Sequence, residues 1–110
     1  IKKLNGMGAK IGIGTDCGTF RELFGRYSDE LKNITSAGVS NYDTLRMATV
    51  VNADIIDMLE KIGTIEKGKY ADIIAVEGNP LESIEVMDSV VLVMKEGTFI
   101  KAKGVFGLNL

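Results

Sequence analysis

The sequence contains no histidine and no tryptophan, and it has only one cysteine and one proline in 110 residues. Without histidine, this chain offers no imidazole to ligate a metal or to activate a nucleophile. The single cysteine, Cys17, excludes an intrachain disulfide and fits a reducing cytosol, so we expect a cytoplasmic protein. No apolar run approaches the roughly 20 residues that cross a bilayer, so we expect no membrane-spanning segment.

The charge is low and balanced, with 13 basic and 15 acidic residues and a net charge of −2. The longest basic cluster is Lys2-Lys3, so the sequence has no basic footprint for nucleic acid. An apolar content of 45% and a charged content of 25% are typical of a globular domain. The 13 glycines predict many tight turns between short elements.

The first 62 residues predict helices on either side of one short strand. Residues 1–5 have the pattern of a helix end, and Gly8 suits the left-handed residue that closes it. Lys10 to Gly14 then predicts a short strand, and Thr15 to Thr19 a loop at its C-terminal end. A longer helical pattern follows this loop and stops at Gly38.

That helical pattern covers residues 20–34, with Gly25 inside the predicted helix. Its apolar face consists of Phe20, Leu23, Phe24, Tyr27, Leu31 and Ile34. Ser40, with an acidic residue three positions later, predicts the N-cap of a second helix that ends at Val51. Asn52 suits the cap of a third, short helix.

After residue 62 the pattern changes to short strands. Ala71 to Val76 is rich in β-branched residues and nearly all apolar, which predicts a strand buried on both faces. Pro80 to Ile84 suits a brief helical turn. Ser89 to Lys95 predicts another strand, and a tight turn at Glu96-Gly97 returns the chain antiparallel over Thr98 to Lys101.

Neither part looks complete. One strand with flanking helices cannot form a parallel sheet, because a parallel strand needs neighbours on both sides. The few strands of the second part make at best an open sheet with exposed edges. We therefore expect the remaining apolar faces to find another chain, most simply in a homo-oligomer.

The candidate catalytic residue is Asp16, which follows the predicted strand in the tripeptide Gly14-Thr15-Asp16. An aspartate in this position is often only a cap or turn residue, and so short a motif matches many unrelated sequences. In barrel enzymes, however, reactive groups lie at the C-terminal ends of the strands. A carboxylate there can hold a divalent metal and accept a proton from metal-bound water.

Other candidates favour structural roles. Cys17 could act as a nucleophile or metal ligand, but with no histidine to activate it a small loop residue is the better interpretation. Asp54 and Asp57 could pair for acid–base work, but a solvated helix face explains them more simply.

Two stretches together carry a family resemblance: IGIGTDCGT at residues 11–19 and GTIEKGKYADIIAVEGNP at residues 63–80. They resemble the C-terminal end of metal-dependent amidohydrolases of the imidazolonepropionase and dipeptidase-like group. The resemblance implies an α/β fold in which residues 1–62 hold the last strand and helices of a (β/α)8 barrel. Residues 63–110 would then form part of a small β-sandwich.

The same resemblance implies roles for single residues. Asp16 looks like the aspartate at the end of the eighth barrel strand, which ligates the metal and serves as proton acceptor and donor for the attacking water. The small-residue stretch at Ala48, Thr49, Asn52 and Ala53 looks like part of the helices that follow that strand. The complete enzyme would use a divalent metal, zinc or similar, to hydrolyse a C–N bond of a small-molecule cyclic amide, imine or dipeptide.

This sequence departs from the family in its ligands. The family's HxH motif, its carboxylated lysine or glutamate and its two later histidines lie upstream of the matching segment, and the sequence begins at Ile1 rather than Met. We therefore expect a fragment of a larger enzyme that neither binds the metal nor turns over substrate alone. The alternative is a non-catalytic α/β module that oligomerises.

Overall fold

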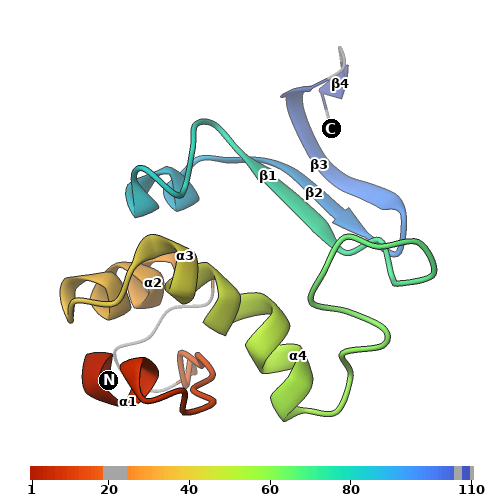
Figure 1. Ribbon diagram of the computed structural model, residues 1–110. Coiled ribbons are helices and arrows are strands. Elements are labelled where there is room, and N and C mark those ends of the chain that lie inside the picture. Colours follow the sequence, from red (N-terminus) through yellow and green to blue (C-terminus); the bar gives the residue numbers. More distant parts are fainter. Residues whose placement is uncertain (19–24, 106–107, 110) are drawn as a thin grey trace.

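The computed structural model describes residues 1–18, 25–105 and 108–109, with helices and strands in separate layers (Figure 1). The helical layer consists of α1 (Lys2–Gly6), α2 (Tyr27–Ser36), α3 (Asn41–Arg46), the π-helix η1 (Met47–Val51) and α4 (Asn52–Ile55). The strands are β1 (Ile73–Val76), β2 (Val90–Lys95), β3 (Thr98–Val105) and β4 (Leu108–Asn109), with the 3₁₀ helix η2 (Ile84–Asp88) between β1 and β2. Among the residues described, no helix is long and apolar enough to cross a membrane.

The helix that begins after Ser40 is continuous to Ile55. The predicted cap is confirmed, because the Ser40 hydroxyl oxygen accepts a hydrogen bond from the Asp43 N–H at 3.0 Å. Backbone angles stay right-handed helical at Met47 and at Asn52, so α3, η1 and α4 follow one another without a break. The prediction that Asn52 caps a separate helix is therefore wrong.

Glycines mark the ends of the other helices. Gly8 and Gly38 have φ of 78° and 88°, which confirms the predicted left-handed ends of α1 and α2. The prediction of a helix from residue 20 is partly outside the described residues. Gly25 has a φ of 87° and precedes α2, so placing it inside the helix was wrong, because a left-handed residue cannot continue a right-handed helix.

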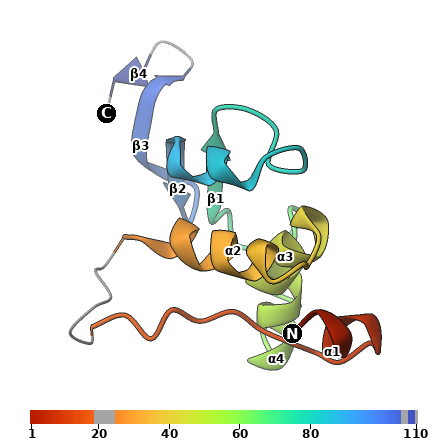
Figure 2. The same cartoon turned by 90° about the vertical axis from the view of Figure 1, so that its left-hand side faces the viewer.

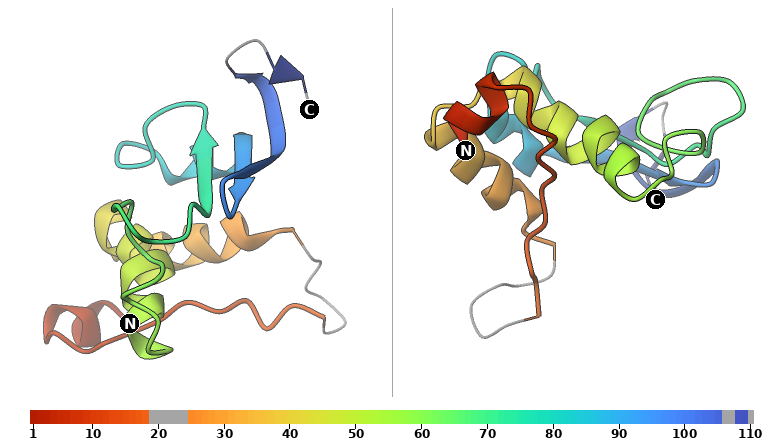
Figure 3. Two further views of the ribbon diagram at one scale, coloured as in Figure 1. Left: turned by 90° about the vertical axis from the view of Figure 1, so that its right-hand side faces the viewer. Right: turned by 60° about the horizontal axis from the view of Figure 1, so that its bottom comes forward.

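The prediction of a strand at residues 10–14 is also wrong. This segment is extended but pairs with no strand in the part of the chain that the structure describes. It runs along the helical layer on the side away from the sheet (Figures 2 and 3). A strand is defined by its ladder of hydrogen bonds, and no neighbouring strand supplies one here.

The sheet has the strand order β1-β2-β3-β4 with antiparallel pairing throughout. The predicted hairpin is confirmed: Glu96 and Gly97 have φ of 48° and 80°, as a two-residue turn with both residues left-handed requires. The β1 strand exists, but the prediction that both its faces are buried is wrong. Ile74 is 52% exposed, because β1 is an edge strand with one face uncovered.

Two further predictions in this layer need adjustment. The helical turn expected from Pro80 is confirmed over residues 80–82, but it does not continue through Ile84, where the separate helix η2 begins. The Asn79 carbonyl accepts hydrogen bonds from the N–H groups of Glu82 and Ser83, which closes that turn. The strand expected to end at Lys101 continues as β3 to Val105.

One hydrophobic cluster joins the layers. Its buried members are Ile13, Leu31, Val39, Met47 and Ile84. These side chains come from the extended segment, from α2, from η1, from the α2–α3 connection and from η2. The cluster therefore fixes the extended segment and the connection between β1 and β2 to the same helices.

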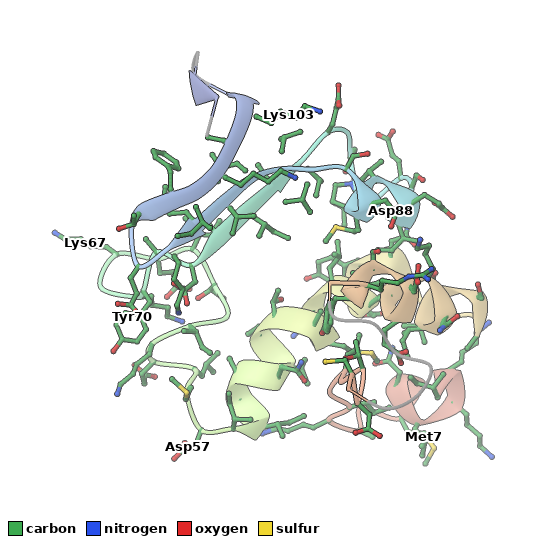
Figure 4. All side chains as sticks on the ribbon, turned by 180° about the vertical axis from the view of Figure 1, so that it is seen from behind. Met7, Asp57, Lys67, Tyr70, Asp88 and Lys103 are labelled. Atoms are coloured by element: carbon green, nitrogen blue, oxygen red, sulfur yellow. The ribbon has the colours of Figure 1, made fainter. Side chains whose placement is uncertain are left out.

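An ion-pair network lies at the edge of this junction. Lys32 Nζ on α2 is 2.8 Å from Asp88 Oδ2 on η2 and 3.0 Å from Asp29 Oδ1 (Figure 4 labels Asp88). The hydrogen bond from Lys32 lowers the pKa of Asp88, and it likewise lowers the pKa of Asp29. The same contacts raise the pKa of Lys32. These groups are solvated, so the network orients η2 more than it stabilises it.

Thr44 is fully buried on α3, and its hydroxyl has no hydrogen-bond partner among the described residues. We expect Thr44→Val to leave the free energy of unfolding unchanged or to raise it by up to about 1 kcal/mol, because it removes an unpaired buried hydroxyl at nearly constant volume. Urea unfolding measures this.

The matched control is Thr35→Val on α2. The Thr35 hydroxyl donates to the Lys32 carbonyl at 2.9 Å, so this change removes a real bond and should cost about 0.5–1.5 kcal/mol. A Thr44→Val variant less stable than Thr35→Val would show that the Thr44 hydroxyl is bonded.

Candidate functional site

Asp16 lies in a tight turn at the end of the extended segment. Its backbone is left-handed, with a φ of 49°, a conformation that aspartate tolerates better than most residues. Asp16 and Cys17 are both exposed, and the Cys17 N–H donates to the Thr15 hydroxyl at 3.2 Å. The turn therefore presents the Asp16 carboxylate to solvent, and Cys17 has the character of a loop residue.

The backbone just before this turn is held by a single side chain, that of Asn52. The Ile13 N–H donates to Asn52 Oδ1 at 3.0 Å, and Asn52 Nδ2 donates to the Ile13 carbonyl at 2.8 Å. A neighbouring strand would satisfy both backbone groups of Ile13 in the same way. We call these two hydrogen bonds the Asn52 clamp.

The clamp depends on a glycine beside it. A Cβ at position 12 would lie 2.3 Å from Asn52 Oδ1 and 3.0 Å from Ile55 Cδ1. Only glycine at position 12 therefore allows the backbone to approach the helix this closely. The Ile13 side chain, buried in the cluster with Met47, fixes the same segment from its other side.

The helix beside the clamp is unusual. Asn52 follows the π-helix η1, a form that is rare and often occurs at functional sites. Gly63, with a φ of 94°, packs against the same helix, and a Cβ there would lie 2.7 Å from the Ala53 Cβ. The small-residue stretch Ala48, Thr49, Asn52 and Ala53 thus accepts close backbone contacts and lines a cavity of about 490 Å³ that extends to β1.

The sequence missed the role of Asn52, which it predicted only as a helix cap. The sequence did offer one indication of this role. Asparagine inside a helix is neutral or unfavourable for helix stability unless its side chain has a specific partner, and Asn52 lies within a helical pattern.

The other acidic candidates do not form a pair for catalysis. Asp54 Oδ2 lies 2.6 Å from Lys10 Nζ in a surface ion pair. Asp57 lies beyond the end of α4, with a φ of 57°, at an outer edge of the molecule (Figure 4). The interpretation as solvated surface residues therefore fits both better.

Comparison with known proteins identifies the family. The amidohydrolase family matches this chain over residues 1–100. The chain therefore belongs to that family. No protein with a curated description matches the sequence.

Solved structures of this family contain the same arrangement. A Xaa-Pro dipeptidase with methionine bound in the active site is 35% identical, with a TM-score of 0.84 over 92% of this chain and 24% of that chain. A putative prolidase from Bifidobacterium longum is 30% identical, with a TM-score of 0.85 over 92% and 26%. A prolidase complexed with N-methylphosphonate-L-proline is 30% identical, with a TM-score of 0.76 over 93% and 25%. The chain thus spans about a quarter of the length of these relatives.

The family is generally metal-dependent. The residues of this chain supply only part of the ligand set that a metal site needs. The exposed Asp16 carboxylate suits a single oxygen ligand. Among the residues that the structure describes, no three His, Cys, Asp or Glu side chains are placed to share an ion. A protein site for a transition metal requires three or four ligands, so this chain does not fit the metal by itself.

We therefore expect the purified chain to contain no stoichiometric zinc, manganese or nickel, because one carboxylate cannot hold these ions against water. Elemental analysis after gel filtration tests this, with Asp57→Asn as the control variant. About one ion per chain, lost in Asp16→Asn but retained in Asp57→Asn, would contradict the expectation.

Proposed function

We propose that this chain is the C-terminal portion of an amidohydrolase that hydrolyses the C–N bond of a small molecule with metal-activated water. A cyclic amide, an imine or a dipeptide would fit this chemistry. The similarity to a Xaa-Pro dipeptidase and to prolidases favours a dipeptide.

The observation that carries the proposal is the position of Asp16. Its carboxylate is exposed on a left-handed turn directly after a segment whose backbone is fixed at Ile13. The left-handed backbone alone does not distinguish Asp16, because Asp57 and Glu96 share it, so the argument rests on the fixed segment before it. A carboxylate that is exposed and that follows a fixed backbone segment suits a reacting group.

We assign Asp16 the role of proton carrier. In the complete enzyme Asp16 would be one ligand of a divalent cation, and that cation would supply acidity to the attacking water and polarise the scissile bond. Asp16 accepts the proton of that water and delivers it to the leaving nitrogen, so its carboxylate ends the cycle unchanged. The cation's other ligands must come from residues beyond this chain.

The proposal also divides the chain. Residues 1–62 would close the barrel, and residues 63–110 would belong to the accompanying β-sandwich. The separation of the helices from the sheet supports this division, since β1 begins after residue 62 and the strands pair only among themselves.

In the complete enzyme, we expect Asp16→Asn to lower kcat by about 10²–10⁴-fold with little change in KM, because the amide keeps the size but cannot accept the proton. Steady-state kinetics with a dipeptide measures this, together with metal content. Asp57→Asn serves as the matched control and should retain activity. A normal kcat at unchanged metal content would mean that Asp16 is structural.

A second candidate is a non-catalytic module that oligomerises, and one observation favours it. Large apolar side chains that line the cavity between the helix and β1 are exposed: Ile56, Ile65, Tyr70 and Ile74. Soluble monomers rarely expose contiguous apolar surface. In the first proposal the rest of the enzyme covers this surface, and in the second a copy of the chain does.

We expect the isolated chain to form a homo-oligomer at low micromolar concentration, because these side chains and the edge of β1 have no cover. Light scattering measures the mass. Ile74→Lys should shift the population toward monomer, whereas Met7→Lys, which changes an exposed side chain on a distant part of the molecule, should not (Figure 4). A monomeric wild type with a cooperative melt would contradict this expectation.

A further inference from the structure

We infer that Asn52 is a positioning residue for Asp16: its side-chain amide bonds both backbone polar groups of Ile13 and fixes the backbone from which the Asp16 turn starts. This inference rests on the proposed function for its catalytic consequence. The clamp itself rests on the hydrogen bonds of Ile13 alone.

The first step is the reach of the clamp. Only Gly14 and Thr15 separate Ile13 from Asp16 along the chain. Because each residue spans at most about 3.6 Å, the carboxylate is tied to a fixed point within roughly 11 Å of backbone. Freedom at Ile13 would pass directly to Asp16, since Gly14 has no side chain to restrain the backbone.

The second step is the rigidity of the support. Asn52 belongs to the continuous helix from Asn41 to Ile55, which is anchored by the buried side chains of Met47 and Ala53. Reactive groups are placed more reliably when regular elements rather than loops hold them. The clamp therefore connects an exposed turn to the best-anchored element of the chain.

The third step is the chemistry of the side chain. Ile13 offers one donor and one acceptor, and an amide matches both at once. Aspartate of the same size would accept from the Ile13 N–H but could not donate to the carbonyl, and leucine could do neither. Gly12 completes the arrangement, because any side chain there would displace Asn52 Oδ1.

The first experiment tests the clamp in the isolated chain by a double-mutant cycle. Gly12→Ala should lower the urea midpoint clearly in the wild-type background, because its Cβ meets Asn52 Oδ1. It should have a clearly smaller effect in the Asn52→Ala background, where that contact is gone and only the approach to Ile55 Cδ1 remains. Equal effects in both backgrounds would overturn the clamp.

Amide hydrogen exchange gives a second, local readout. The Ile13 amide should exchange about tenfold faster in Asn52→Leu than in wild type, after correction for global stability. Asn33→Leu, at an exposed asparagine on α2, is the matched control. Leu92→Ala in the sheet controls for general destabilisation. Unchanged protection of Ile13 in Asn52→Leu would also overturn the clamp.

The second experiment tests positioning in the complete enzyme. A displacement of about 1 Å at a reacting group can lower the rate about 10²-fold. Asn52→Asp, which keeps the size and one hydrogen bond, and Asn52→Leu should each lower kcat by about 10–100-fold, with KM and metal content unchanged. Asn33→Leu and Leu92→Ala should keep kcat per folded molecule.

The outcomes separate this inference from the proposed function. A normal kcat in Asn52→Leu, while Asp16→Asn is inactive and the Ile13 amide is released, would overturn the positioning role and leave the proposed function intact. A normal kcat in Asp16→Asn would overturn the role proposed for Asp16, and with it the catalytic consequence drawn here. The double-mutant cycle would still decide whether the clamp exists.

Discussion

A backbone segment that packs against a hydrophobic core must satisfy its own N–H and C=O groups, and at Ile13 one asparagine side chain does this. The other local features depend on these two hydrogen bonds between Asn52 and Ile13. Position 12 must be glycine, the helix must remain unbroken through Asn52, and the Ile13 side chain can then enter the core beside Met47. The exposed turn that carries Asp16 starts from this fixed point.

The same helix also receives the chain that leads to the sheet. Gly63 packs closely on Ala53, and Ile84 of η2 completes the buried cluster from the other side. The layers are thus joined by small residues in one place and by large apolar side chains in another. The match to the amidohydrolase family likewise covers both layers, over residues 1–100.

Sequence reasoning succeeded where the cause of a structure lies in adjacent residues. The Ser40 cap and the Glu96-Gly97 turn are local, and the family resemblance rested on contiguous motifs. It failed where partners are distant in sequence. The extended segment before Gly14 has no strand neighbour, Ile74 has an uncovered face, and Asn52 serves a residue 39 positions away. Among the site residues, the position of Asp16 after an extended segment was predictable, but its support was not.

The π-helix has a consequence for the contacts that this helix can make. A π turn holds one residue more than an α turn, so η1 behaves as a single-residue insertion in an otherwise regular helix. Winding the same residues as a regular α-helix would rotate the two ends relative to each other by about 100°. Met47 could then stay in the core, or Asn52 could face Ile13, but not both. The π winding of this helix is therefore what allows Met47 and Asn52 to keep their partners at the same time.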